Sequence, residues 1–388
     1  MEEKKLKVAV IGVGGISEVH IHGYKQLKNV ELYAFCDINE NTLKLKGERH
    51  GVTRLYTDEA TMLRELPEID AVSVCTWNAA HAPCTIMALN AGKHVLCEKP
   101  MAMNAQEAEE MLEAARRNNR LLMIGFVRRF GNDCAVLKDF IDAGDFGELY
   151  YAKANYTRRN GCPGGWFGNK ALSGGGPLID LGVHVIDLVR YLMGNPQPVS
   201  VYGVTYDKLK NRPGIKGKLG YVSETVTEKP IFNVEDLATA LIRFDNGATL
   251  AVEAAFSLNI PHDIGKIELF GTKSGAVLDP ELTLYTEQNH YLTNVSLADS
   301  TALSFDGLFD NEIAHYIRCI TDGIPCRNPA EDGVALMKIL DAVYESARTG
   351  HEVVIHSSPG SSPPAFCRGG EHFVPARRNP RRLRQKRG

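Results

Sequence analysis

The chain has 388 residues, of which 44% are hydrophobic and 23% charged, values typical of a globular protein with room for two domains. The net charge is −3, but residues 357–388 carry eight Lys or Arg and one Glu, a net of +7, which leaves −10 for the rest. An acidic body of this kind argues against nucleic-acid binding. The composition also excludes collagen-like, coiled-coil and wholly disordered chains.

No export signal, membrane span or metal site is predicted. The apolar run Val8–Val13 ends at Gly14, and no run approaches the roughly 20 apolar residues that cross a bilayer. The nine cysteines include no Cys-x-x-Cys pair, and no Cys/His pairs have zinc-ligand spacing on a turn. We therefore expect a cytoplasmic protein with reduced thiols, no membrane partner and no metal.

Over the first 125 residues, short apolar runs alternate with segments of helical periodicity. The predicted strands are Leu6–Ile11, Val30–Cys36, Ala71–Cys75, His94–Cys97 and Leu121–Gly125, and the predicted helices are Ile16–Leu27, Asn39–Arg49, Ala80–Ala91 and Ala105–Arg117. Apolar strands joined by helices are typical of a parallel sheet with both faces covered. Residues 1–125 are therefore predicted to form a doubly wound α/β domain.

The pattern changes after Gly125. Helices are predicted at Phe130–Ala143, Pro177–Leu192, Glu312–Thr321 and Gly333–Ala347, and strands at Glu148–Thr157, Val199–Val204, Ala238–Phe244, Ala248–Phe256 and Lys266–Phe270. Residues 126–356 are expected to form an α+β domain with a large open, mainly antiparallel sheet, in which Asp245-Asn246-Gly247 makes a hairpin turn. Residues 207–233 are predicted to be a mobile polar excursion. The Arg-rich tail, 357–388, is predicted to be disordered because it can bury little apolar surface.

A glycine-rich turn joins the first predicted strand to the first predicted helix. Gly12-Val13-Gly14-Gly15-Ile16-Ser17 fits the dinucleotide-binding pattern Gly-x-Gly-x-x-Gly, with Ser in place of the last Gly. The first glycine permits the tight turn, the second lets a pyrophosphate approach the backbone, and the last position needs only a small residue. The helix N-terminus would face the phosphates. Gly12, Gly14, Gly15 and Ile16 are therefore candidate cofactor-binding residues.

Asp37 follows the second predicted strand, about 20 residues beyond the turn, where an acidic side chain binds the adenosine ribose hydroxyls. A carboxylate at this position repels the 2′-phosphate of NADP, and the next residues, Ile38 and Asn39, include no Arg. NAD is therefore the predicted cofactor. The alternative is that Asp37 is an ordinary helix-capping residue.

Four further segments, in this order and spacing, resemble one known family. They are Cys75-Thr-Trp-Asn-Ala-Ala-His81, Cys97-Glu-Lys-Pro100, Gly174-Gly-Gly-Pro-Leu-Ile-Asp-Leu-Gly-Val-His-Val-Ile-Asp187 and Tyr344-Glu-Ser-Ala-Arg-Thr-Gly350. With the glycine turn, they make residues 6–355 similar to the glucose–fructose oxidoreductase / inositol dehydrogenase / rhizopine-catabolism (Gfo/Idh/MocA) family. The resemblance implies a Rossmann domain and a substrate-binding α+β domain whose open sheet often mediates homo-oligomers, as dimers or tetramers. It also implies a sugar or cyclitol substrate.

Carried over by motif, Lys99, Asp180 and His184 are the catalytic residues. Hydride transfer to nicotinamide requires a proton to leave the alcohol oxygen, and His184 can accept it near neutral pH. Asp180 lies four residues earlier in the same predicted helix, so both side chains share one face. Lys99 follows a strand's carboxyl end, where ligands bind in doubly wound sheets, and its ammonium can stabilise a developing alkoxide.

A second group of residues is expected around this centre. Thr76, Trp77, Asn78 and His81 would approach the nicotinamide, Glu98 its ribose, and Arg128 or Arg129, Tyr156, Arg159 and Trp166 the substrate, because sugar sites pair aromatic faces with charged donors. Ordinary core or surface roles are the alternative for each. Trp77 stands where many relatives have Pro, and a Trp there also occurs among inositol-dehydrogenase-like members, which slightly favours a cyclitol.

The leading interpretation is an NAD-dependent dehydrogenase that acts on a secondary alcohol of a sugar, glycoside or cyclitol. The resemblance also allows an enzyme that holds NAD tightly and uses transient oxidation to cleave or isomerise a sugar. A third possibility is a non-enzymatic NAD-binding regulator with the Arg-rich tail as its contact arm. The presence of the Lys, Asp and His set argues against this last possibility.

Overall fold

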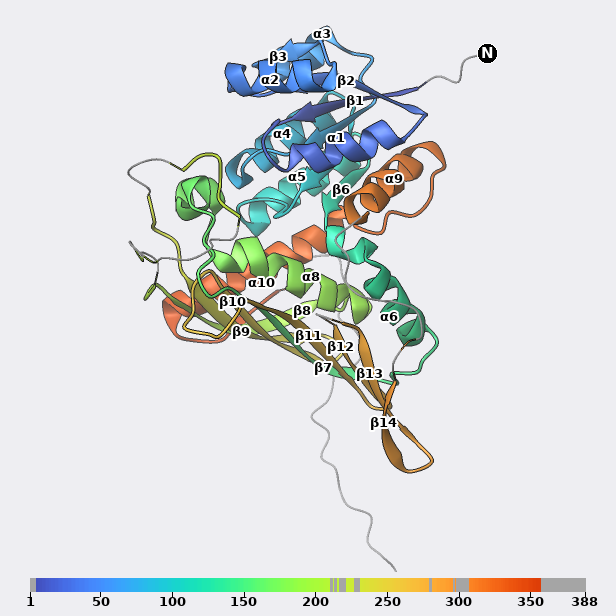
Figure 1. Cartoon of the computed structure of the whole chain (residues 1–388), viewed down its shortest axis with the longest axis vertical. Coiled ribbons are helices and arrows are strands. Elements are labelled where there is room, and N and C mark those ends of the chain that lie inside the picture. Colours follow the sequence, from blue (N-terminus) through green and yellow to red (C-terminus); the bar gives the residue numbers. More distant parts are fainter. Residues whose placement is uncertain are drawn as a thin grey trace, which may run out of the picture. The chain divides into compact units, whose positions relative to one another are not determined.

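The computed structural model describes residues 5–209, 212, 215, 221–226, 231–278, 281–295, 297 and 307–356. Residues 1–355 form one compact unit. The predicted disordered tail, and much of the predicted excursion at 207–233, lie outside the described residues. Within the unit, one sheet follows the other along the chain (Figure 1).

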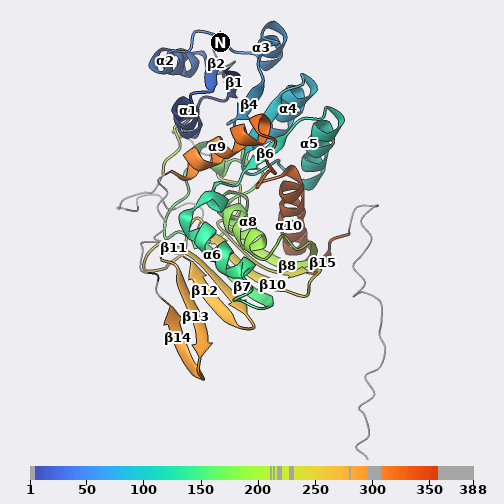
Figure 2. The same cartoon turned by 90° about the vertical axis from the view of Figure 1, so that its right-hand side faces the viewer.

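The first sheet has six parallel strands in the order β3-β2-β1-β4-β5-β6. Its elements are β1 (Leu6–Ile11), α1 (Ser17–Gln26), β2 (Val30–Cys36), α2 (Glu40–His50), β3 (Leu55–Tyr56), α3 (Glu59–Glu65), β4 (Ala71–Val74), α4 (Asn78–Asn90), β5 (His94–Glu98), α5 (Ala105–Arg117) and β6 (Leu122–Gly125). Figure 2 shows α1 and α2 on one side of this sheet and α3, α4 and α5 on the other. The strand order is that of a Rossmann fold, so the predicted doubly wound domain is confirmed.

Local signals explain where several of these helices begin. The side chains of Asn39, Asp58 and Asn104 each accept a hydrogen bond from a backbone N–H in the first turn of α2, α3 and α5. The sequence prediction missed β3 and α3. The strand has only two residues and the helix seven, so neither shows a full period of apolar residues.

The second sheet has nine strands in the order β14-β13-β12-β11-β7-β10-β9-β8-β15. Its strands are β7 (Leu149–Thr157), β8 (Pro198–Tyr206), β9 (Leu237–Phe244), β10 (Thr249–Ala255), β11 (Ile264–Gly271), β12 (Ser274–Leu278), β13 (Thr283–Gln288), β14 (Tyr291–Val295) and β15 (Val353–Val354). All neighbours are antiparallel except β7 and β10, which pair in parallel. The predicted hairpin is confirmed: β9 and β10 pair across residues 245–247, and Gly247 has φ +86°.

Helices cover one face of the second sheet (Figure 2). They are α6 (Asn132–Asp142), α8 (Val183–Leu192) and α10 (Ala330–Thr349). Shorter turns precede α6 and α8: η1 (Val127–Phe130), η2 (Gly165–Gly168), α7 (Lys170–Ser173) and the π-helical η3 (Leu178–Gly182). The predicted single helix Pro177–Leu192 is therefore a π turn followed by an α-helix. π turns are rare and often lie at functional sites.

The chain returns to the first sheet before it ends. Helix α9 (Leu308–Thr321) packs on α1, where a Cβ on Gly23 would lie 2.9 Å from Ile313 (Figure 1). Ile313, Tyr316 and Ile317 of α9 share a buried cluster with Val8 of β1. The predicted domain boundary at residue 125 stays a prediction, because packing of this kind crosses it.

One stretch, Lys170–Leu192, has the length and mean hydropathy of a membrane span. Of its apolar window, 78% is buried inside the fold. The stretch therefore belongs largely to the protein core, and it carries Asp180 and His184.

Candidate active site

The glycine turn between β1 and α1 leaves room for a ligand. Gly12 has φ +81°, and a Cβ there would lie 2.8 Å from the backbone of Cys75, so the turn requires glycine. A Cβ on Gly14 would meet nothing within 4 Å. Buried Ser17 donates a hydrogen bond to the Gly14 carbonyl oxygen at 2.7 Å, which closes the turn below this open side.

Asp37, which directly follows β2, is hydrogen-bonded to this turn. Its Oδ2 accepts a hydrogen bond from the Val13 N–H, and its Oδ1 accepts one from the Asn39 N–H, both at 2.8 Å. The residue that caps α2 is Asn39, so Asp37 itself is not the cap. The half-buried carboxylate thus lies at the edge where the resemblance places the adenosine ribose.

The four predicted residues after β4 divide between the loop and the start of α4. Asn78, the first residue of α4, is buried and donates a hydrogen bond to the Ser173 carbonyl oxygen at 2.7 Å, which ties the start of α4 to α7. The ring nitrogens of buried His81 lie 2.7 and 3.1 Å from the carbonyl oxygens of Pro100 and Thr76. Thr76 and its neighbour Trp77 are half-buried and keep accessible surface for a cofactor.

Glu98 belongs to a buried polar network beneath the same edge. Its Oε1 lies 2.8 Å from His20 Nε2, and the other ring nitrogen of His20 lies 3.1 Å from the Ser73 hydroxyl. Burial raises the pKa of Glu98, but the hydrogen bond with His20 and the charges of His20, Lys99 and His81 together leave the pKa below its usual value. Glu98 Oε2 accepts from the Lys99 N–H at 3.1 Å, so the network fixes the backbone that carries Lys99.

Lys99 and Asp180 meet between the two sheets. Lys99 follows β5, and its Nζ lies 3.1 Å from Asp180 Oδ1 and 3.3 Å from the Asp180 carbonyl oxygen. The two side chains are 18% and 12% exposed, so the pair is shielded but still accessible. A cation at the carboxyl edge of the first sheet is thereby joined to the π turn that precedes α8.

His184 stands in a positive environment one turn further along. Burial lowers its pKa well below the usual value, and the charges of Lys99, Arg128 and Arg158 lower it further. Its imidazole is therefore neutral near neutral pH and able to accept a proton. The positive charges of Lys99, Arg128 and Arg158 therefore act on His184, and Lys99 also contacts Asp180.

The remaining predicted substrate residues differ in their surroundings. Half-buried Tyr156 lies under the Arg158 guanidinium, 5.6 Å from ring centroid to Cζ. Trp166, also half-buried, stacks on Phe167 at 3.9 Å. Exposed Arg159 donates to the Pro261 carbonyl oxygen at 3.2 Å and is tied to the loop before β11.

Arg129 differs from the substrate-binding role considered for it. Its side chain is fully buried, and its guanidinium pairs with Asp187 at 2.6 Å and with Asp332 at 2.8 Å. Its Nη1 also donates a hydrogen bond to the Arg327 carbonyl oxygen at 2.7 Å. With its donors used in this way, Arg129 has a structural position, and its neighbour Arg128 is the arginine that acts on His184.

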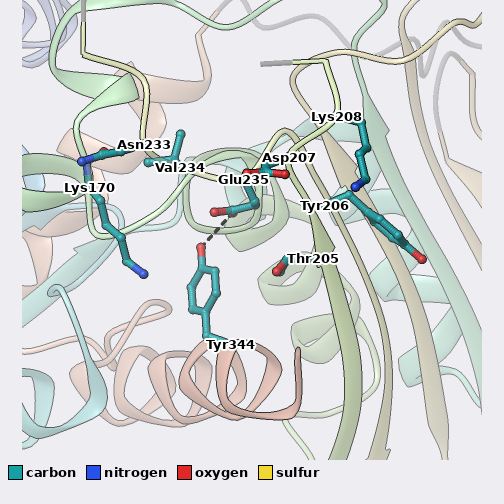
Figure 3. A pocket seen from close by; sticks show the side chains of 9 residues that line it. All are labelled: Lys170, Thr205, Tyr206, Asp207, Lys208, Asn233, Val234, Glu235 and Tyr344. Atoms are coloured by element: carbon teal, nitrogen blue, oxygen red, sulfur yellow. Dashed lines mark hydrogen bonds between the residues drawn. The ribbon is translucent and has the colours of Figure 1, made fainter. Parts of the chain in front are cut away.

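Glu235, two residues before β9, makes hydrogen bonds to the glycine run that leads into the π turn. Its carboxylate accepts hydrogen bonds from the backbone N–H groups of Gly176 at 2.9 Å and Leu178 at 3.3 Å. The Tyr344 hydroxyl donates to the same carboxylate at 2.9 Å (Figure 3). A Cβ on Gly175 would lie 2.0 Å from the Tyr344 hydroxyl, and one on Gly176 would lie 2.2 Å from the Glu235 carbonyl oxygen. Two of the three glycines are therefore required by these contacts.

A cavity of about 300 Å³ lies beside this support, lined by residues that include Lys170, Lys208 and Asn233 (Figure 3). None of Lys99, Asp180 and His184 lines it. It is a hollow next to Glu235 and Tyr344 rather than the space around the predicted catalytic groups.

Sequence reasoning missed four residues of this site: His20, Arg158, Glu235 and Tyr344 as a hydrogen-bond donor. One of them had a usable signal. Alternation along β7 puts Ala152 and Ala154 on the buried face, and continued past Tyr156 it selects Arg158 rather than Arg159. Glu235 lies 59 residues from the backbone that it holds, so no local pattern indicates it.

Comparison with known proteins identifies the relatives of this chain. A D-glucoside 3-dehydrogenase of Escherichia coli (strain K12) is 35% identical over 91% of this chain and 98% of that enzyme. A myo-inositol 2-dehydrogenase of Thermotoga maritima is 29% identical over 71% of this chain and 75% of that enzyme. Among solved structures, a levoglucosan dehydrogenase in complex with NADH shares the fold, with a TM-score of 0.81 and 24% identity over 92% of this chain and all of that chain.

Two family models match in series. The model described as an oxidoreductase family with an NAD-binding Rossmann fold matches residues 6–126, and the model of the C-terminal alpha/beta domain of that family matches residues 138–355. The family predicted from the motifs is confirmed. The chain belongs to the GFO/IDH/MocA oxidoreductase family and has its NAD-binding Rossmann domain.

Proposed function

We propose that this protein is an NAD-dependent dehydrogenase that oxidises, or in reverse forms, a secondary alcohol of a glycoside, sugar or cyclitol. The observation that carries the proposal is the 3.1 Å pair between Lys99 Nζ and Asp180 Oδ1, with neutral His184 beside it. The pair lies after β5, at the edge of the sheet where nucleotide cofactors bind.

Each of the three side chains has a distinct task in this reaction. His184 accepts the proton of the substrate hydroxyl, because its imidazole is neutral at working pH. Lys99 donates a hydrogen bond to the same oxygen and stabilises the negative charge that develops there. Asp180 orients the Lys99 ammonium and can accept a hydrogen bond from a neighbouring substrate hydroxyl. NAD, when bound, supplies the acceptor for the hydride that leaves the carbon.

The described residues fit NAD as this cofactor. The open side of Gly14 leaves room for a pyrophosphate at the start of α1. Asp37 presents a carboxylate that accepts hydrogen bonds from ribose hydroxyls and repels the additional phosphate of NADP.

The substrate class follows from the relatives. The glucoside dehydrogenase aligns with almost the whole chain, and the inositol dehydrogenase aligns with about 71% of it. Both act on secondary alcohols of polyhydroxylated rings. Because the glucoside enzyme has the higher identity, we place glycosides first and cyclitols second.

A substrate screen tests the proposal. The purified protein is given NAD or NADP with glycosides, free sugars, cyclitols or sugar phosphates, and reduced cofactor is followed by absorbance. We expect NADH to form with at least one glycoside or cyclitol. Turnover without net NADH, by a protein purified with bound NAD, would instead identify an enzyme that oxidises its substrate only transiently. Absence of both would reject an enzymatic role.

We also propose that the protein is a homo-oligomer formed through the uncovered face of the second sheet. By the strand register, Tyr202, Leu241 and Tyr285 point to this face, and each is more than 40% exposed. The mass in solution tests this: Leu241→Lys should shift the protein towards monomer, whereas Leu45→Lys, at an exposed site on α2, should not. A wild-type monomer would contradict the proposal. The cytoplasmic location expected from the sequence stays a prediction.

A further inference from the structure

A cluster of soft metal ligands lies outside the site described above. His315 and Cys319 are one turn apart on α9, and Cys326 follows after the chain reverses through Gly323, which has φ +67°. The three ligand atoms all lie within 4.8 Å of one another, and His315 Nε2 is 3.4 Å from Cys319 Sγ. We propose that His315, Cys319 and Cys326 bind one Zn²⁺ ion.

The distances suit zinc. With Zn–S bonds of about 2.3 Å and Zn–N bonds of about 2.0 Å, a tetrahedral ion holds a nitrogen and a sulfur about 3.5 Å apart and two sulfurs about 3.8 Å apart. The nitrogen–sulfur separation in the protein is already of this size. Two thiolates and an imidazole select zinc over magnesium or calcium, which prefer oxygen ligands. Since all three residues are only half-buried, water can complete the coordination.

Zinc binding should depend on pH. Zinc is bound by thiolates and by neutral imidazole, so binding would release protons from the two thiols. The affinity should therefore rise with pH.

One existing contact opposes the ion. The Arg327 N–H donates to His315 Nε2 at 2.9 Å and competes for the same lone pair. A single hydrogen bond of this kind contributes far less free energy than a structural zinc site does. The loss is therefore small compared with the gain, even for a site with three protein ligands.

The bound zinc ion would cross-link two segments of the chain. It would join the end of α9 to the segment that contains Arg327, whose carbonyl oxygen holds buried Arg129. His315 also lies 5.3 Å from the Phe130 ring of η1, measured between ring centroids. Zinc would thereby stabilise the junction between α9 and η1, and this role does not depend on the identity of the substrate.

Metal binding by the full-length chain tests the proposal. The protein is stripped with a chelator, reduced with a thiol-free phosphine, and titrated with Zn²⁺ against a chromophoric chelator, with bound zinc measured by mass spectrometry. Co²⁺ is used in parallel as a probe, because thiolate ligation gives a charge-transfer absorption. We expect one zinc per chain, a cobalt–thiolate band and a higher melting temperature with zinc.

Variants locate the ion. Loss of an outer-shell partner already costs about 10–100-fold in metal affinity, so Cys319→Ser and Cys326→Ser should each cost about 100-fold or more. Cys84→Ser, which removes another half-buried thiol on α4, should bind zinc like the wild type. Stoichiometric zinc that survives in both site variants, no zinc in the reduced wild type, or formation of a Cys319–Cys326 disulfide with no zinc binding would each overturn the proposal.

Discussion

The apolar segment Lys170–Leu192 contributes one aspartate to each of two ion pairs, and the two aspartates are seven residues apart. The pairs differ in their exposure to solvent and in their other contacts. Asp180 pairs with Lys99, which follows β5, and Asp187 pairs with Arg129, which follows the neighbouring strand β6. The first pair is 12–18% exposed, whereas both partners of the second are at most 1% exposed. Arg129 also binds Asp332 and a carbonyl oxygen, so its donors are occupied.

The difference separates a reactive pair from a structural one. An ammonium with accessible surface can exchange part of its contact with Asp180 for a contact with a substrate oxygen. A guanidinium held by two buried carboxylates cannot do so, because moving it away leaves the Asp187 carboxylate without its cationic partner in a low-dielectric interior. We therefore expect changes at Arg129 to act on stability and changes at Lys99 to act on turnover.

The largest expected effect is on the free energy of unfolding of Arg129→Met. This change leaves Asp187 buried without its cation and Asp332 with Arg190 as its remaining cationic partner, which should destabilise the protein by about 3–5 kcal/mol in urea unfolding. The matched control is Arg116→Met, which breaks the exposed pair with Glu331 and should cost less than about 1 kcal/mol. Equal losses in the two variants would remove the distinction between buried and exposed pairs.

Lys99→Met should reduce turnover rather than the free energy of unfolding. Loss of a group that stabilises a developing oxyanion costs about 10²–10³-fold in kcat, or roughly 3–4 kcal/mol of transition-state stabilisation. Steady-state kinetics with the substrate found in the screen would measure this, and unfolding should change little. Lys138→Met, at a surface lysine of α6, should keep wild-type turnover. Normal turnover by Lys99→Met would reject the assigned mechanism.

Much of the fold could be predicted from local patterns. The strands β1, β2, β4, β5 and β6 are mostly apolar runs, and the hairpin between β9 and β10 has the turn sequence Asp245-Asn246-Gly247. Two features had no local signal. The return of α9 to pack on α1 depends on a contact between Gly23 and Ile313, nearly 300 residues apart. The parallel pairing of β7 with β10 depends on the order in which distant strands assemble.

The site, like the fold, has residues that the sequence predicted and residues that it did not. Motif spacing predicted Lys99, Asp180 and His184, and the contacts of Lys99 with Asp180 are present. The motifs did not separate Arg128 from Arg129, because neighbouring residues of one type differ only in direction, and direction depends on partners such as Asp332. The His20–Glu98 contact joins residues 78 apart, so periodicity within either segment could not reveal it.

A smaller effect should follow from Tyr344→Phe, which tests how the Asp180 segment is positioned. This change removes one hydrogen bond to Glu235 and should cost about 1–2 kcal/mol in unfolding. If the π turn shifts, kcat should fall up to about tenfold while KM for NAD stays constant, since 1.4 kcal/mol corresponds to a factor of ten. Tyr291→Phe, at an exposed position on β14, is the control. A loss of stability with unchanged kcat would make Tyr344 structural only.

The smallest effect concerns the proton acceptor and its cationic neighbours. Because burial and nearby charges lower the pKa of His184 in the folded enzyme, kcat/KM should fall only when the pH drops well below 6.5. Arg128→Gln removes one positive charge, so the pKa should rise and the acidic limb should move to higher pH, by less than about one unit or 1.4 kcal/mol. Arg158→Gln should move it in the same direction, and Arg116→Gln should not move it. A limb that shifts to lower pH, or stays fixed in both variants, would show that His184 is not the group that titrates.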